Sequence, residues 1–316
     1  MNPRFIDSEK NCEFCFNEMV SKHGGLWHIC TPGNLQEIIN ISDADFKFAV
    51  SNTALSAAET GIMILTDAQM ENHIHVLAAC TAEDCLHFIQ SYKYRLGKHL
   101  ERNGRYTSLK HFTCDSPIPV GTLEMARNEI AYINRNGFVA NRKWTPFTYP
   151  WGSGYLYFNP SAQSLRGTSY NSMPFVEKRA MTYRRIAPMP DCYSVCEGMI
   201  LPSGYADVKS GESFFRDAHH YMVAVTRNFE AYSEEAKRLG DKVIVDDEEL
   251  YNVAKMMGEN GYRVTQPSLL SPSAKVEVAR KLRSDYNASN GQIRRILKLP
   301  IETVETLFPT KKALSE

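Results

Sequence analysis

The stretch QMENHIHVLAA, residues 69–79, places two histidines on either side of one isoleucine. The apolar residues around them predict a buried strand, in which positions i and i+2 face the same side. His73 and His75 should therefore point together, with Ile74 facing the opposite side. Two neutral imidazoles at this spacing can share one divalent ion, but a second element must supply a further ligand. Taken alone, a His-x-His motif favours the simpler interpretation of two histidines satisfied by ordinary hydrogen bonds.

A second group with chemical potential lies in ARNEIAYINRNGF, residues 126–138. Tyr132 and Asn136 are four residues apart on a predicted helix, so their side chains share one face. A phenol and an amide could thus be presented together to whatever lies over the histidine pair. A tyrosine hydroxyl is a weak nucleophile at its free pKa, so attack on a phosphate requires a metal to polarise the target. Without that context, Tyr132 would be interpreted as a core tyrosine of an amphipathic helix.

The elements that would position these side chains follow the order β-α-β-β-α-β-α. Ser42 and Thr81 are predicted N-caps, while Gly104 and Gly137 are predicted helix ends. The expected strands and helices, in chain order, are residues 25–32, 42–60, two strand pieces within 61–79, 81–104, 108–120 and 121–137. This alternation predicts an α+β fold with a ferredoxin/RRM-like antiparallel sheet and flanking helices.

The second half of the chain has a different character. Residues 161–270 hold clusters of Pro, Ser and Tyr between short helical stretches, and residues 271–316 predict three helices with a tight turn. We therefore expect a catalytic domain over 1–160, a linking and partly helical region over 161–270, and a helix-turn-helix-like unit over 271–316. Glu302 and Glu305 in the last helix are unsuited to a major groove, so the alternative is a trihelical packing or interaction module.

Composition limits the class of protein. Hydrophobic residues make up 43% and charged residues 23%, the balance of a soluble globular protein, and no apolar run is long enough to span a membrane. The N-terminus lacks the pattern of a signal peptide, so we expect a cytoplasmic protein with reduced cysteines. The pairs Cys12/Cys15 and Cys192/Cys196 could form a zinc site, but packed or surface thiols are the favoured interpretation.

Charge is distributed unevenly although the net charge is zero. The segment SYKYRLGKHLERNGRYTSLK carries six basic residues against one acid, with three tyrosines interleaved. Lysines and arginines can follow phosphates and aromatic rings can stack on unpaired bases. The alternative is a solvated helix face, and this segment alone does not decide between the two.

Three motifs in order resemble the single-tyrosine HUH transposases, in which U is a hydrophobic residue. MENHIHVL is similar to that family's Met-x-Asn-His-x-His stretch. YINRNG followed by YPWGSGYLYF resembles the YIxxNPV…PWSSY segment of the REP-associated tyrosine transposase branch. WHICTPG…DADFKFAV is similar to the family's first strand and the acidic turn into its first helix. The resemblance covers roughly residues 20–160, about half of the chain.

The resemblance implies a mechanism. His73 and His75 would bind Mg²⁺ or Mn²⁺, with Asn136 as third ligand, and Tyr132 would attack single-stranded DNA to form a 5′-phosphotyrosine and a free 3′-OH. The reverse reaction would rejoin strands. The implied partner is single-stranded or hairpin DNA, without a membrane, and the chain could act as a homodimer in which Tyr132 serves either subunit. The expected DNA contacts are Tyr92, Lys93, Arg95, Lys98, Arg102, Arg142 and Lys143.

Two departures from the family pattern concern glycines. The family's Pro after the Asn is Gly137 here, and PWSS becomes PWGS, which could loosen the helix end that holds Asn136. Two other functions remain open. A non-catalytic DNA-binding relative of a transposase would suit the zero net charge and the added second half, whereas an unrelated metal-dependent phosphoesterase would use the histidines without Tyr132.

Overall fold

The computed structural model describes residues 3–33, 36–140, 143–183, 189–227, 247–286 and 288–309. The chain divides into two compact units, Met1–Asp241 and Lys242–Glu316. This division differs from the boundaries expected at residues 160 and 270. The described part of 161–227 belongs to the first unit, and a helix before residue 270 belongs to the second.

The first unit is built on a four-stranded antiparallel sheet. Its strands are β1 (Leu26–Cys30), β2 (Met63–Gln69), β3 (Ile74–Ala79) and β4 (Ile118–Pro119), in the order β2-β3-β1-β4. β2 and β3 form a hairpin, with a register shift between Ile64 and Thr66. The α+β class predicted from the sequence is confirmed.

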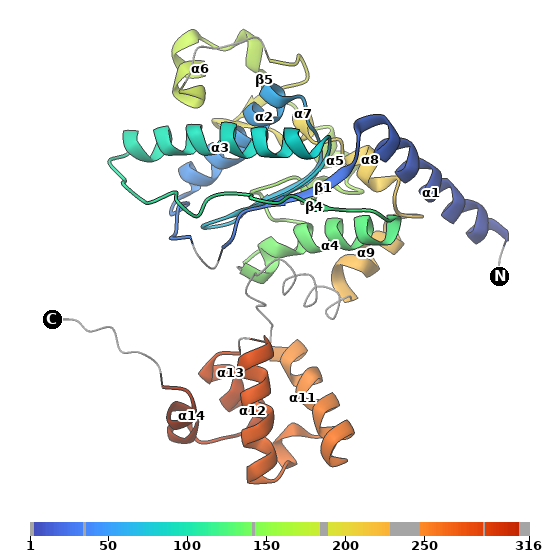
Figure 1. Ribbon diagram of the computed structural model, residues 1–316, viewed down its shortest axis with the longest axis vertical. Coiled ribbons are helices and arrows are strands. Elements are labelled where there is room, and N and C mark those ends of the chain that lie inside the picture. Colours follow the sequence, from blue (N-terminus) through green and yellow to red (C-terminus); the bar gives the residue numbers. More distant parts are fainter. Residues whose placement is uncertain are drawn as a thin grey trace. The chain divides into compact units, whose positions relative to one another are not determined.

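Helices cover the two faces of this sheet (Figure 1). Helices α2 (Asp43–Thr60) and α3 (Ala82–Arg102) cover one face, and α4 (Leu123–Ala140) with α9 (Ala218–Arg227) cover the other. The α2/α3 face carries the main apolar core, to which the sheet contributes Ile29, Ile64, Ile74, Val76 and Ala78. Because side chains alternate along a strand, the residues between these face α4.

The starts of α2 and α3 were predicted correctly from their N-cap residues. Ser42 caps α2 by accepting from the Asp45 amide, and Thr81 caps α3 in a capping box with Asp84. The predicted end of the tyrosine helix at Gly137 is wrong, because α4 continues to Ala140. A helix that the sequence pattern did not predict, α1 (Pro3–His23), precedes the sheet.

Residues after 150 complete the first unit by covering the edge of β2 and the outer side of α2. The Gln69 amide donates to the Trp151 carbonyl at 2.7 Å, and the Asp207 amide donates to the Ile64 carbonyl at 2.8 Å. A second sheet, in the order β5-β6-β7, places the Tyr193 hydroxyl 3.0 Å from the Ala54 carbonyl of α2. These elements are η1 (Gly154–Leu156), α5 (Pro160–Gln163), β5 (Thr168–Ser169), η2 (Tyr170–Ser172), α6 (Phe175–Thr182), β6 (Ser194–Cys196), β7 (Met199–Ile200), α7 (Pro202–Tyr205) and α8 (Val208–Glu212).

The second unit is helical. It contains α11 (Asp247–Tyr262), η3 (Pro267–Leu269), α12 (Pro272–Tyr286), α13 (Asn290–Leu297) and α14 (Ile301–Leu307). Ser289 caps α13 in a capping box with Gln292, and the three last helices agree with the sequence prediction. The core of this unit is formed by buried apolar residues from all four α-helices: Leu250, Ala254, Val278, Leu282, Ile293, Leu297 and Val304. Among the described helices of the chain, none combines the length and the apolar character that crossing a bilayer would require.

Candidate metal centre

The α4 face of the sheet carries a group of buried polar side chains. Strand register places Cys30 opposite His75 and His28 opposite Leu77, so His28, Cys30 and His75 all face α4. His28 and His75 are closed to solvent, and Ile74 lies in the core on the other face. His73 just precedes β3, and its imidazole lies against that of His75 with ring centroids 4.9 Å apart. The histidine pair therefore points to one side, as the sequence predicts.

Four short contacts link Glu129, the rings of His28, His75 and His73, and Asn72 into one series, which we call the imidazole chain. A Glu129 carboxylate oxygen lies 2.7 Å from Nδ1 of His28, and Nε2 of His28 lies 3.1 Å from Nδ1 of His75. Nε2 of His75 lies 3.1 Å from Nε2 of His73, whose Nδ1 lies 2.7 Å from the Asn72 side-chain oxygen. The chain runs from the interior, where Glu129 is 1% exposed, to the half-buried His73.

The orientation of the Asn72 amide follows from its other contacts. Its Nδ2 donates to the carbonyl of Gly33 at 2.6 Å and to that of Gln36 at 2.8 Å. Oδ1 must then face His73 and accept from Nδ1–H, which leaves the lone pair of His73 on Nε2. Gly33 also packs against this ring, since a Cβ there would lie 2.6 Å from Nδ1. Asn72 and Gly33 together fix the direction of the His73 lone pair.

The chain of rings has one proton fewer than its contacts require. Both ends are acceptors, namely the Glu129 carboxylate and the Asn72 oxygen, so four contacts require four N–H groups. Three neutral imidazoles supply three. The deficit is met by a proton on the Glu129 carboxyl or on a ring, or by a cation placed between two facing lone pairs. This arrangement suits a bound metal ion, because buried lone pairs that face each other repel.

A buried His-Cys-His group at this site could hold a metal ion. One donor atom from each of His28, Cys30 and His75 lies within 4.8 Å of the other two. The Glu129–His28 contact has the form of the carboxylate–histidine pairs that orient metal ligands in proteins. The sequence analysis identified His75 but not His28, Cys30 or Glu129. Their signals were present, because His28 and Cys30 alternate along the first strand and Glu129 lies one turn before Tyr132.

Tyr132 joins this group from α4. Its ring lies edge-on to the imidazole of His75, with centroids 5.4 Å apart, and 6.2 Å from the ring of His28. Tyr132 is 2% exposed and Asn136, one turn later on α4, is 5% exposed. The phenol predicted as nucleophile and the histidines predicted as ligands therefore come from different elements and meet at one place. The role of Asn136 as third ligand stays a prediction.

Both glycine departures from the family pattern have a packing reason. A Cβ on Gly137 would lie 2.1 Å from the Tyr149 ring, whose hydroxyl donates to the Gln69 carbonyl at 2.5 Å. A Cβ on Gly152 would lie 2.2 Å from the Asp67 carbonyl oxygen, because this segment pairs with the edge of β2. Gly137 therefore allows Tyr149 to pack closely on α4, and Gly152 allows its segment to pair with β2.

The expected DNA surface on α3 needs correction. Tyr92 is 1% exposed, stacks on Phe112 and donates to the Gln69 side chain, so its ring is closed to bases. Arg95 is 4% exposed and ion-paired with Glu59, which makes it part of the core of this unit. These side chains face inward because they lie on the apolar side of the helix.

The other expected DNA contacts fall into three places. Lys93 is half-buried on α3, whereas Lys98 and Arg102 are exposed there, on the face of the sheet opposite to the candidate metal centre. The exposed Lys143 follows α4, with its ammonium 4.8 Å from the centre of the Trp144 ring. Arg142 lies outside the described residues.

Another buried carboxyl, Asp67 on β2, lies apart from this group. Its strand partner is Val76, so it faces the α2/α3 side of the sheet. Burial raises the pKa of Asp67 from 3.8 to about 6, against hydrogen bonds from Ser153, Gln69 and Tyr205 that favour the charged form. Its hydrogen-bonded partners hold it in the core. Asp67 is therefore a structural group, and its ionisation at higher pH lowers the stability of the folded state.

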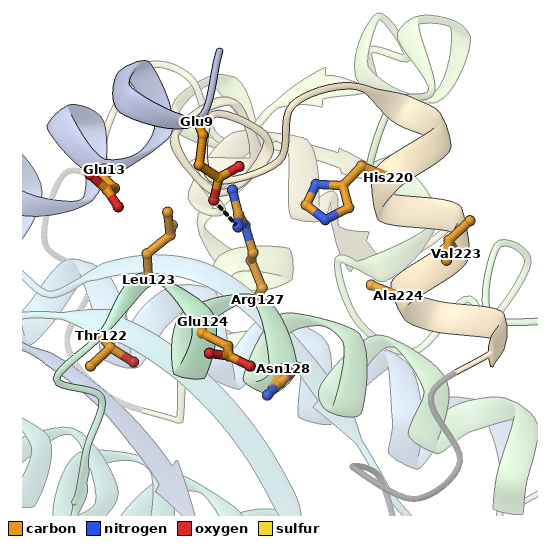
Figure 2. A pocket seen from close by; sticks show the side chains of 10 residues that line it. All are labelled: Glu9, Glu13, Thr122, Leu123, Glu124, Arg127, Asn128, His220, Val223 and Ala224. Atoms are coloured by element: carbon orange, nitrogen blue, oxygen red, sulfur yellow. Dashed lines mark hydrogen bonds and ion pairs between the residues drawn. The ribbon is translucent and has the colours of Figure 1, made fainter. Parts of the chain in front are cut away.

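A pocket between α1, the start of α4 and α9 is chemically different from the histidine group (Figure 2). Its lining includes Glu9, Glu13 and Glu124, and Arg127 is paired with Glu9 at 2.6 Å. Three carboxylates against one neutralised arginine disfavour a phosphate ligand. We therefore place the candidate chemistry at the histidine group and not in this pocket.

Comparison with known proteins adds no relative. No protein-family model, curated protein or solved structure matches this chain. The functional evidence therefore consists of the side chains themselves: three linked imidazoles, a thiol, a carboxylate and a phenol that lie together on the α4 face of the sheet.

Proposed function

We propose that the protein is a metal-dependent single-strand DNA nickase and strand transferase of the HUH transposase type. The observation that carries this proposal is the contact of the Tyr132 ring with His75, at 5.4 Å between centroids. A nucleophile and a cation site from separate elements have to converge for this reaction. The order of the resembling motifs along residues 20–160 supports the same reaction class.

The donor set fits a divalent cation. Nε2 of His73 and Nε2 of His75 lie 3.1 Å apart, and two nitrogens at this separation can both reach one ion through bonds of about 2.1 Å. His73, His75 and Asn136 would hold the ion in our proposal. Mg²⁺ prefers oxygen ligands, whereas imidazoles suit Mn²⁺ better, so we favour Mn²⁺. The ion would act as a Lewis acid that polarises the scissile phosphate.

The reaction is a phosphoryl transfer to Tyr132. Its phenolic oxygen forms a bond to phosphorus and loses its proton, while the bond from phosphorus to the 3′ oxygen breaks and that oxygen gains a proton. The products are a 5′-phosphotyrosine and a free 3′-OH. One phosphodiester replaces another, so attack by a 3′-OH can reverse the reaction and join strands.

The surrounding architecture supports the finer structural part of the proposal. The order β2-β3-β1-β4, with α2 and α3 on one face, suits a sheet of the ferredoxin/RRM type. The short helices α13 and α14 in the second unit suit a helix-turn-helix-like module. We also propose that single-stranded or hairpin DNA is the partner, that a homodimer forms, and that the eight reduced cysteines suit a cytoplasmic setting.

The decisive test is capture of the covalent intermediate. Labelled single-stranded hairpin DNA incubated with the protein and Mn²⁺ should give a protein–DNA adduct that survives denaturation. Tyr132→Phe should abolish it. Tyr92→Phe is the matched control, since Tyr92 is also a buried, hydrogen-bonded phenol but lies on the opposite face of the sheet, and this variant should retain the adduct.

The alternatives give different results in the same assay. DNA binding without an adduct across varied hairpins would favour a non-catalytic DNA-binding protein. Cleavage that survives Tyr132→Phe would favour a metal-dependent phosphoesterase that uses the histidines alone.

A further inference from the structure

His75 is shared by two pairs of facing ring nitrogens. Its Nε2 faces Nε2 of His73 at 3.1 Å, and its Nδ1 faces Nε2 of His28 at the same distance. A neutral imidazole has one lone pair and one N–H, so His75 can offer its lone pair in one direction only. The tautomer of this one ring therefore decides where the missing proton of the imidazole chain, and hence a cation, is placed.

The two positions differ in their donors. The outer position lies between Nε2 of His73 and Nε2 of His75, and His73 is half-buried. The inner position lies between His28 and His75, with Cys30 close enough to supply a third donor within 4.8 Å. Thiolate and imidazole together favour zinc and other thiophilic cations, whereas a site without sulfur suits harder ions.

The inner position is also prepared by its surroundings. A Glu129 carboxylate oxygen lies 2.7 Å from Nδ1 of His28, and this ion-pair contact favours a proton on Nδ1, which leaves the lone pair of His28 on Nε2, facing His75. Both histidines are closed to solvent, so water would screen the attraction between a cation and these ligands only weakly. The contact from His75 Nε2–H to His73 Nε2 would remain in this state, and all four contacts of the imidazole chain would then be satisfied.

From these contacts we infer that His28, Cys30 and His75 form a second cation site for a thiophilic divalent ion such as Zn²⁺, and that this site and the outer one exclude each other. Binding releases the Cys30 thiol proton to solvent, and His75 then carries its N–H on Nε2, without any redox change. Because the outer position would serve the proposed nickase, Zn²⁺ should inhibit it. That last consequence depends on the proposed function, whereas the site and the exclusion do not.

The site can be tested with Co²⁺ as a spectroscopic substitute for Zn²⁺. We expect one equivalent of Co²⁺ to give a thiolate-to-cobalt charge-transfer band with the full-length protein. Cys30→Ser should lose the band, and Cys192→Ser, which alters an exposed thiol, should retain it. A wild-type protein without this band, or a Cys30→Ser variant that keeps it, would overturn the inference.

Exclusion can be measured without activity. Bound Mn²⁺ loses its free-ion EPR signal, so Zn²⁺ added to the Mn²⁺-loaded protein should restore that signal as Mn²⁺ is released. In Cys30→Ser, the Zn²⁺ concentration required should rise about tenfold or more. Mn²⁺ that stays bound when the wild-type site fills with Zn²⁺ would overturn the exclusion. Absence of a DNA adduct with Mn²⁺ would instead refute the nickase and leave both metal results unchanged.

Discussion

Glu129 holds His28 through a contact of 2.7 Å between a carboxylate oxygen and Nδ1, and both side chains are closed to solvent. The two residues come from α4 and β1, 101 positions apart in the sequence. This contact fixes which nitrogen of His28 faces His75, and it thereby anchors the interior end of the imidazole chain. A buried carboxylate in this role acts on a metal centre through its ligands and does not touch the ion.

Removing the Glu129 carboxylate should weaken metal binding. We expect Glu129→Ala to lower Zn²⁺ affinity at the inner position by about 10- to 100-fold, because the ligand His28 loses the carboxylate that orients it. Glu129→Gln can still accept through Oε1 and should lose less. Isothermal titration with Zn²⁺ measures both. Glu124→Ala removes an exposed carboxylate from the same helix and should leave the affinity unchanged; an equal loss in this control would contradict the prediction.

A side chain at position 137 should destabilise the first unit. The Tyr149 ring occupies the place where a Cβ on Gly137 would lie, at 2.1 Å, and the hydroxyl anchors that ring to β2. Overpacking of this kind costs about 1–3 kcal/mol, so Gly137→Ala should lower the free energy of unfolding by that amount. Gly261→Ala in α11, where a Cβ would meet open space, should be neutral or stabilising. Urea denaturation compares the two variants, and equal stability would refute the packing argument.

Asp67 should make the stability of the first unit depend on pH. Its pKa is about 6 in the folded protein against 3.8 for an ordinary Asp, so the folded state holds the proton more tightly than the unfolded state. The stabilisation by this group is therefore complete below pH 3.8 and is lost as the pH rises through about 6. The difference of about two pH units corresponds to a loss of about 3 kcal/mol.

Asp67→Asn removes this pH dependence because the amide does not ionise. Its free energy of unfolding relative to the wild type should increase by about 2 kcal/mol between about pH 4 and about pH 7. Urea denaturation of both proteins at several pH values measures this difference. Asp115→Asn, which alters an exposed carboxyl, should show no comparable trend, and a flat profile for Asp67→Asn would contradict the prediction.

The basic residues of α3 should separate into two classes. Replacing Lys93, Lys98 and Arg102 by alanine should weaken single-stranded DNA binding equally for all sequences, and should reduce the salt slope by about 0.7 for each phosphate that is no longer neutralised. Arg95→Ala should lower stability, because its ion pair with Glu59 is removed, and should leave the salt slope unchanged. Affinity measured across a range of salt concentrations distinguishes the classes. A salt slope that is unaltered in the triple variant would show that α3 is not part of the DNA-binding surface.

The inward-facing residues of α3 show what a sequence pattern can and cannot separate. Tyr92 and Arg95 were grouped with exposed neighbours because the segment is basic and aromatic as a whole. Helical spacing alone places Tyr92 in line with Phe88 and Leu96, which are both buried. The burial of Arg95 was harder to predict from the sequence, because it depends on Glu59 at the end of another helix.

Residues 161–227 show a different limit. Their elements are short, and they find their place through contacts such as the one between Tyr193 and Ala54, 139 positions apart. No hydrophobic periodicity marks such a segment, so the sequence predicted a linking region. In the structure these residues pack against α2 and β2.

The local features of this protein follow from its sequence alone: the helices capped by Ser42 and Thr81, the α+β class, and the common direction of His73 and His75. These depend on hydrogen bonds and side-chain periodicity within a few residues. The tertiary fold was needed to bring Glu129, His28 and Tyr132 to the histidine pair. That assembly depends on strand register and on the burial of α4 against the sheet, which join residues too far apart in the chain for any local pattern to record.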